Sequence, residues 1–232
     1  MNHIPVIISI AFTALVAVSL LTTVLVFRPF YLKSTSKRKA FPLLLLGSIL
    51  IVQSILTMSG FFVQTIHQIP PPMVIPIILL FITIIYLVFG YEPLRNIQPQ
   101  HAIKLAYLQM FRLPLELIFI WLLSHHSIPT EMTFEGRNPD ILIGLSAPVV
   151  ALAVQKNWLP VKFLIVWNLI GLGFLINIVT VAILCLPTPF RFFFESVPNE
   201  FVLYFPFNLV PSALVMLALF LHLLSLKILF RK

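Results

Sequence analysis

The chain has 232 residues, of which 60% are hydrophobic and only 9% are charged. A soluble domain of this size carries about 25% charged residues to cover its surface, so the composition excludes an ordinary soluble protein. The net charge of +8 does not indicate nucleic-acid binding, because the basic residues fall in short segments between apolar runs rather than along one face. We therefore expect an integral membrane protein whose partner is the lipid bilayer, with no nucleic acid among its partners.

Apolar runs follow one another along the chain, each bounded by charges, prolines or polar clusters. At about 1.5 Å per residue, each run is long enough, or nearly so, to cross a hydrocarbon core of about 30 Å. The runs are too long and continuous for strands of a β-barrel. The sequence predicts an all-α fold, a seven-helix transmembrane bundle that forms a single domain over residues 1–232. The predicted spans are 4–27, 41–63, 73–90, 105–124, 141–158, 161–186 and 201–226.

The charges between these spans predict an orientation. The segment 28–40 holds five basic residues, and if it is cytoplasmic, every second loop after it is cytoplasmic too. Twelve basic residues then lie on the cytoplasmic side, against Arg137 and Arg191 on the other side. This asymmetry follows the positive-inside rule. It predicts an outside N-terminus and a cytoplasmic C-terminus.

Small residues and prolines mark three of the predicted spans. Gly144, Ala147 and Ala151 recur at helical spacing, which predicts a face on which another helix packs closely. A proline inside a helix removes a backbone hydrogen bond and kinks the helix. We expect kinks at Pro114, Pro148 and Pro211.

Arg112 and Glu116 are the only charged residues well inside a predicted span. Counted from Lys104 at the inner boundary, they lie about 12 Å and about 18 Å deep. A charge at such a depth costs at least about 2.5–3.5 kcal/mol on insertion scales unless it is paired or hydrated. Helical spacing places both on one face, together with Gln109. That face is therefore predicted to point into the bundle or into a water-filled cavity.

The partners of these charges are predicted to lie on other helices, because arginine before glutamate is the less favourable order for a pair within one helix. Gln53 in the second span and Asn168 and Asn177 in the sixth span lie at compatible depths. Two hypotheses follow. In one, Arg112 and Glu116 belong to a substrate-binding polar core of a transporter or ligand-binding bundle, where Arg112 attracts an anionic group of a small solute and Glu116 carries a proton or a counter-charge. In the other, the same residues only fix helix packing in an accessory or scaffold protein that associates with other membrane subunits.

A third hypothesis is an outward-facing, metal-dependent membrane enzyme. His125 and His126 end the fourth span, and Glu131 follows in the next loop. Imidazole nitrogens and carboxylate oxygens suit zinc or a similar metal ion. The spacing matches no dedicated motif such as H-E-x-x-H, however, and adjacent histidines at a membrane boundary are ordinary interfacial residues. We expect no cofactor and favour a non-enzymatic role.

Three segments, RLPLELIFIWLL, MTFEGRNPDILIGLSAP and VWNLIGLGFLINIV, resemble an uncharacterised family of bacterial seven-span integral membrane proteins of unknown function. The resemblance covers about the second half of the chain, from Arg112 onward. It implies the span boundaries and a location in the bacterial inner (plasma) membrane. It implies no activity.

Overall fold

A computed structural model describes residues 4–95 and 97–231, and all regular structure within them is helical. The all-α class predicted from the sequence is therefore confirmed. Short 3₁₀ turns (η1, Glu92–Leu94; η2, Gln109–Phe111; η3, Thr130–Met132; η4, Phe201–Leu203) and one π-helical turn (η5, Val210–Leu214) accompany the helices. The helices are α1 (Val6–Lys33), α2 (Phe41–Met58), α3 (Phe61–Thr65), α4 (Val74–Phe89), α5 (His101–Leu108), α6 (Arg112–Ser124), α7 (Ile141–Gln155), α8 (Phe163–Leu184) and α9 (Val215–Leu229).

Five helices of the described chain are long and apolar enough to cross a membrane, which corrects the predicted number of seven. They are α1, α2, the continuous helix His101–Ser124 formed by α5, η2 and α6, then α8, and the helix Val210–Leu229 formed by η5 and α9. The predicted third and fifth spans correspond to the apolar helices α4 and α7, which have 16 and 15 residues. Both are shorter than the roughly 20 residues that a full crossing requires.

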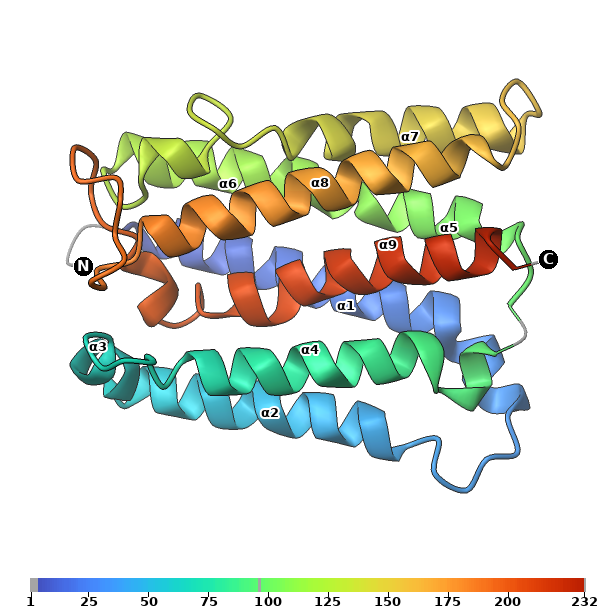
Figure 1. Ribbon diagram of the computed structural model, residues 1–232, viewed down its shortest axis with the longest axis horizontal. Helices are drawn as coiled ribbons and strands as arrows, with labels where there is room; N and C mark the ends of the chain where they lie inside the picture. The colour runs from blue at the N-terminus through green and yellow to red at the C-terminus, as the bar shows by residue number, and fades with distance from the viewer. Residues whose placement is uncertain (1–3, 96, 232) are drawn as a thin grey trace.

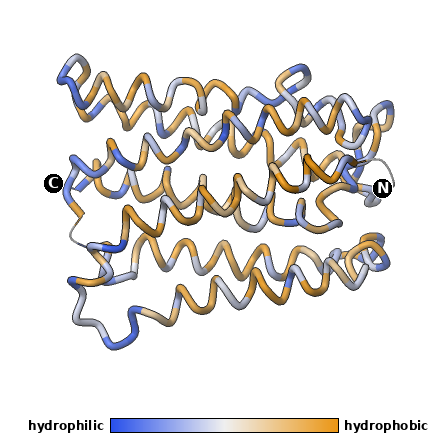
Figure 2. The backbone as a smooth tube through the Cα atoms, turned by 180° about the vertical axis from the view of Figure 1, so that it is seen from behind, coloured by the Kyte–Doolittle hydropathy of each residue, from blue (hydrophilic) through white to orange (hydrophobic). Residues whose placement is uncertain are grey.

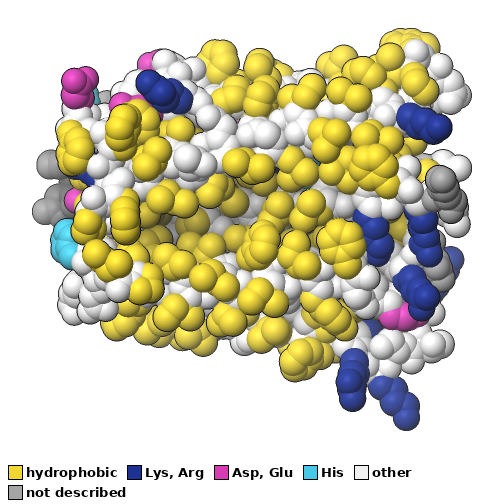
Figure 3. Space-filling model, in the orientation of Figure 1, with side chains coloured by type: hydrophobic (Ala, Val, Ile, Leu, Met, Phe, Trp, Pro, Cys, Tyr) yellow, Lys and Arg dark blue, Asp and Glu magenta, His cyan; other side chains and the backbone are white. Residues whose placement is uncertain are grey.

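The longer helices lie side by side along the longest dimension of the molecule, with α9 in the middle (Figure 1). Helix α9 packs against α4, α5 and α8. The most apolar stretch of Val210–Leu229 is 72% buried, whereas those of α1 and α2 are each 17% buried. Residues on α1 and α2 are nonetheless strongly apolar, so the protein exposes hydrophobic side chains over its flanks (Figure 3). This arrangement is compatible with a membrane protein.

The middle of the bundle is apolar, and hydrophilic residues gather at its two ends (Figure 2). These ends differ in the sign of their charge. The loops 125–140 and 185–209 lie at the end that carries the N-terminus, and they hold five of the chain's seven acidic residues. We call this the acidic end. Lysine and arginine side chains gather at the opposite, basic end, near the C-terminus (Figure 3).

The helix ends differ from the predicted spans where local backbone chemistry overrides hydropathy. Helix α2 stops at Met58, five residues before the predicted end, because Gly60 adopts a left-handed conformation with φ 77° and starts the short helix α3. The last long helix starts at Val210 rather than 201, after a segment that includes η4. Hydropathy alone does not detect such breaks, since the interrupting residues are themselves apolar.

Two of the three predicted proline kinks coincide with departures from α-helical geometry. The 3₁₀ turn η2 ends three positions before Pro114, whose missing N–H cannot bond to the preceding turn. Pro211 lies in the π-helical turn η5. Pro148, in contrast, sits within α7, which continues as α-helix on both sides of it.

The predicted small-residue face of α7 is confirmed. Gly144, Ala147 and Ala151 are buried where α7 meets α5, η2 and α6. A Cβ atom at Gly144 would lie 2.5 Å from the backbone nitrogen of Leu113. The obstructing atom belongs to backbone, so only glycine permits this approach.

We expect Gly144→Ala to lower the free energy of unfolding by about 1–3 kcal/mol, because α7 must move away from α6 to make room for the methyl group. Reversible unfolding in detergent micelles measures this effect. Gly173→Ala on α8 is the matched control, since a Cβ atom there meets nothing within 4 Å. Equal destabilisation by both substitutions would show that the close α6–α7 contact is not the cause.

Candidate functional site

The loop 125–140 folds back against the bundle at the acidic end, beside α6, and α7 begins only after it, well along the bundle (Figure 1). Backbone hydrogen bonds give the loop a defined shape, including Arg137 N–H to the Glu131 carbonyl at 3.1 Å and Asn138 N–H to the Thr133 carbonyl at 3.1 Å. Thr133 is fully buried. Helix α7 is short because this loop takes up the length that a longer helix would otherwise fill.

Arg112 pairs with the last residue of this loop. Its Nη1 donates to Oδ1 of Asp140 at 2.8 Å, the one ion pair found among the described residues. Arg112 is 2% exposed and Asp140 is 9% exposed. Asp140 immediately precedes α7, where a carboxylate also interacts favourably with the helix N-terminus. The ion pair thus ties the start of α7 to the start of α6.

Glu116 holds the middle of the same loop. One carboxylate oxygen accepts a hydrogen bond from the backbone N–H of Phe134, and the other accepts one from Nδ2 of Asn138 at 2.9 Å. Asn138 also donates to the Met132 carbonyl at 3.1 Å, and its Oδ1 accepts from the backbone N–H of Asp140 at 3.1 Å. Asn138 therefore connects Glu116 to the residue that pairs with Arg112.

We call Arg112, Glu116, Asn138 and Asp140 the latch. Two of these residues come from α6 and two from the loop, and all four are buried. A charge in an apolar interior requires partners, and here the loop supplies them. The latch therefore fastens the loop 125–140 to the helices.

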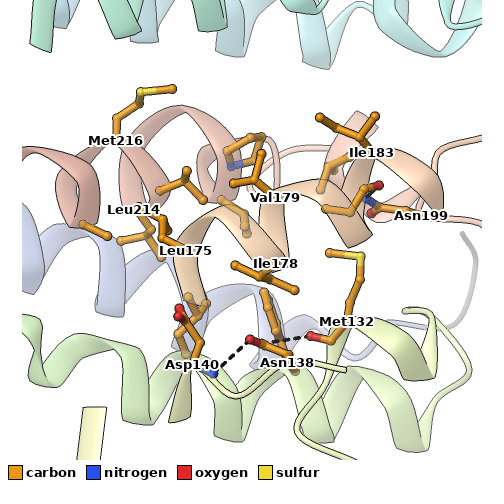
Figure 4. A pocket seen from close by; sticks show the side chains of 18 of the residues that line it. Met132, Asn138, Asp140, Leu175, Ile178, Val179, Ile183, Asn199, Leu214 and Met216 are labelled. Atoms are coloured by element: carbon orange, nitrogen blue, oxygen red, sulfur yellow. Dashed lines mark hydrogen bonds between the residues drawn. The ribbon is translucent and has the colours of Figure 1, made fainter. Parts of the chain in front are cut away.

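A cavity of about 230 Å³ lies beside the latch, between α4, α6, α8 and the helix formed by η5 and α9. Figure 4 shows its apolar wall, formed largely by α8 with Leu175, Ile178 and Val179, and Asn138 and Asp140 at one edge. The polar residues that line it are the four latch residues and Asn199. The cavity is thus lined mainly by apolar side chains, and its polar lining is limited to the latch and Asn199.

Arg112 is only partly satisfied at this cavity. Asp140 accepts from Nη1, but Nε and Nη2 of Arg112 have no hydrogen-bond partner in the protein. Oδ1 of Asn199 also lacks a partner, while its Nδ2 donates to the Ala182 carbonyl at 2.9 Å. Buried donors without acceptors are rare and cost about 1–3 kcal/mol each, so an acceptor brought to them would relieve that cost.

The predicted partners of Arg112 and Glu116 lie elsewhere, and that prediction was wrong. Gln53 is buried on α2, where its Oε1 has no partner. Asn177 donates to the backbone carbonyl of Arg137 at 2.7 Å, so it contacts the loop but neither charged side chain. The nearest partners come from residues 132–140, which hydropathy had placed outside the membrane-spanning part.

Asn168 belongs to a second buried polar cluster. Its Nδ2 donates to Oγ of Ser225 at 3.0 Å, and its Oδ1 lies 2.8 Å from Nδ1 of His222. His222 is fully buried, and Gly171 makes room for its ring. Gln109 contacts α9 as well, through a bond from Nε2 to the Ala218 carbonyl at 3.3 Å. These groups join α8 and α5–α6 to the central helix α9 and are separate from the latch.

The proposed metal ligands do not converge. His126 is exposed just after α6, His125 is partly exposed, and Oε2 of Glu131 accepts from Oγ of Ser196 at 2.6 Å. Over residues 4–95 and 97–231, no three His, Cys, Asp or Glu side chains group closely enough to hold a metal ion. The described residues therefore lack the geometry that the enzyme hypothesis requires.

The polar core predicted from the sequence did not include Asn138 or Asp140. Two signals pointed to them. First, the predicted span that follows them, 141–158, was among the shortest, so its start was a candidate for a longer buried segment. Second, an arginine buried in a helix needs an acidic partner, and the chain has few acidic residues. Asp140, at the edge of that short span, satisfies both conditions.

Comparisons with known proteins identify a family but no activity. The profile of a family described as a domain of unknown function (DUF8737) matches residues 70–230, a range that contains the whole latch. No curated protein matches the chain, and no solved structure matches it either.

Proposed function

The chain belongs to the DUF8737 family, a domain of unknown function, and from this premise we propose that it is a membrane protein that binds a hydrophobic molecule in the cavity beside the latch. The proposed ligand has an apolar body and one group that accepts hydrogen bonds. The observation that carries the proposal is a buried arginine that lines an otherwise apolar cavity and has two nitrogen atoms without a partner in the protein.

The apolar lining favours a hydrophobic ligand over a water-soluble one. Each methylene group that leaves water for such a cavity contributes about 0.8 kcal/mol. A strongly hydrated ion or sugar would lose its water and find few replacement partners. The predicted transport of a small or proton-linked solute stays a prediction, and the cavity lining favours an amphiphile as the cargo.

The latch favours a ligand with an acceptor oxygen. Asp140 occupies only one of the three nitrogen atoms of the Arg112 guanidinium. A carbonyl, hydroxyl or carboxylate oxygen at the latch would satisfy a donor that is otherwise unpaired. Glu116 stands close by and is already bound to the loop, which favours a neutral acceptor over a second negative charge.

We further propose that α4 and α7 lie in the bilayer with the five longer helices, in the inner (plasma) membrane, with the acidic end outside and the basic end cytoplasmic. The charge difference between the two ends supports this orientation. For α7, the latched loop would complete the crossing, because non-helical backbone is tolerated at membrane depth where protein covers it.

A scaffold role is the second candidate function, and one observation favours it. Both carboxylate oxygens of Glu116 and the Nη1 atom of Arg112 are engaged by the loop. In that case the latch only shapes the acidic end of the protein, for contact with other membrane subunits. The two candidates differ in whether the cavity is occupied.

Filling the cavity tests the proposal. We expect Val179→Trp on α8 to weaken binding of decanol by about tenfold or more, because the indole ring takes up space in a cavity that Val179 lines. Native mass spectrometry of the purified protein with decanol, decanoate and decane as probes measures binding. Decanol is expected to bind best, since its hydroxyl can accept from Arg112 without adding a charge.

The matched control is Val166→Trp on the same helix, where the valine is 55% exposed on the flank of the protein. It should bind decanol like the unmodified protein. Equal binding by both variants, or equal binding of decanol and decane, would contradict the ligand proposal and favour the scaffold role.

A further inference from the structure

A second apolar groove lies between α1 and α2, which are adjacent in sequence but pack against different partners. Helix α1 packs mainly against α5, α6 and η1, whereas α2 packs mainly against α3 and α4. The space between them measures about 360 Å³ and is lined by aliphatic and aromatic side chains, among them Val24, Leu46 and Leu50. The groove is distinct from the cavity beside the latch, with which it shares one lining residue, Met216.

The groove ends among cations at the basic end. Arg28 and Tyr31, in the last two turns of α1, line it there. Arg28 is exposed and has neither a hydrogen-bond partner nor an ion pair among the described residues. Lys33 follows on the same helix, and Lys37 and Arg38 follow in the next loop. The one acidic residue nearby, Glu92, accepts a hydrogen bond from Ser34 and forms no ion pair with these cations.

The loop that follows α1 is held in place rather than free. Nζ of Lys39 donates to the carbonyls of Ser34 at 2.8 Å and Tyr31 at 3.2 Å. The hydroxyl of Tyr91, at the far side of the groove, donates to the Lys39 carbonyl at 2.6 Å. Burial raises the pKa of Tyr91 to about 12, so this donor stays protonated at neutral pH. The basic residues are therefore presented at a defined place at the mouth of the groove.

We propose that this groove binds an anionic phospholipid of the surrounding bilayer, with one acyl chain between α1 and α2 and the phosphate against Arg28. An apolar groove on the flank of a membrane protein faces acyl chains and not water, and a chain that fills it restores dispersion contacts. Basic pockets between helices on the cytoplasmic side recognise anionic headgroups. The apolar groove and its cationic mouth together match the two parts of such a lipid.

The test compares dioleoyl phosphatidylglycerol with dioleoyl phosphatidylcholine, which share acyl chains and differ in headgroup charge. Native mass spectrometry of the full chain reports the bound lipids. Arg28→Gln should lower the affinity for phosphatidylglycerol about fivefold and that for phosphatidylcholine less, because the choline cation of phosphatidylcholine offsets the charge of its phosphate. Arg28→Lys keeps the charge and should retain most of the preference. Lys162→Gln, a basic residue in the loop before α8 and outside the groove, should change neither lipid.

The acyl part is tested separately. Leu46→Trp fills the groove and should weaken both lipids, whereas Leu44→Trp, at a position that is 69% exposed on the same helix, should weaken neither. The inference is overturned if Arg28→Gln leaves the preference intact, or if Lys162→Gln reduces it equally, which would indicate diffuse attraction. It is also overturned if Leu46→Trp has no effect. A thermal unfolding midpoint for each variant distinguishes lost binding from lost folding.

Discussion

We expect Asp140→Leu to lower the free energy of unfolding by about 3–5 kcal/mol, the largest effect of any single substitution considered. The reason is that it leaves Arg112, which is 2% exposed, as an unpaired charge in an apolar interior. The lost hydrogen bond itself accounts for only part of the cost. Reversible unfolding by a denaturing detergent in mixed micelles, followed by helical circular dichroism, measures the change.

Two variants give this prediction its control. Glu135→Leu removes an exposed carboxylate of the same loop and should alter stability by less than about 0.5 kcal/mol. The double variant Arg112→Met with Asp140→Leu removes both charges and should recover much of the loss, because a buried ion pair replaced by apolar side chains is often close to neutral. A double variant as unstable as Asp140→Leu alone would show that the unpaired charge is not the cause.

The second large effect concerns Glu116 and the loop that it holds. We expect Glu116→Leu to speed trypsin cleavage after Arg137 by about thirtyfold in proteoliposomes, because two loop donors lose their acceptors at about 1 kcal/mol or more each. Arg137 is the one trypsin site within residues 125–140. Opening of the loop would expose that bond, and the amount of cleaved product measures the opening.

Glu116→Gln should have a smaller effect, because its remaining carbonyl oxygen can still accept one of the two hydrogen bonds. Glu135→Gln, on the exposed face of the same loop, should leave the cleavage rate unchanged. Cleavage that is equally slow in Glu116→Leu and the unmodified protein would contradict the role of Glu116 in holding the loop. Faster cleavage at the basic end as well would instead indicate general unfolding.

The sequence was sufficient to predict the helical class and the approximate position of every long helix. Hydropathy and periodicity depend on residues a few positions apart, and the helices follow the same short-range rules. It also singled out Arg112 and Glu116, since a charge in an apolar run is conspicuous and needs a partner. The buried position of both residues confirms this part of the argument.

The number of helices of spanning length and the partners of Arg112 and Glu116 could not be predicted from the local pattern of residues. Residues 73–90 and 141–158 had the composition of spans, but α4 and α7 end after 16 and 15 residues, so the described chain has five helices of spanning length. Polar residues between two apolar runs are normally assigned to a loop in water. The loop 125–140 departs from that rule because its own backbone bonds and the latch satisfy the polar groups of its buried residues.

By itself, then, the sequence determined an apolar helical bundle with unlike ends and a buried arginine and glutamate that need partners. Only the tertiary structure decided that those partners are Asp140, Asn138 and the backbone of Phe134, in a loop that folds back into the bundle. It also decided that the latch borders a cavity and that α1 and α2 stand apart around a groove. The physical reason is range: hydropathy is a sum over neighbours in the chain, whereas an ion pair, a cavity and a groove depend on how distant segments are brought together.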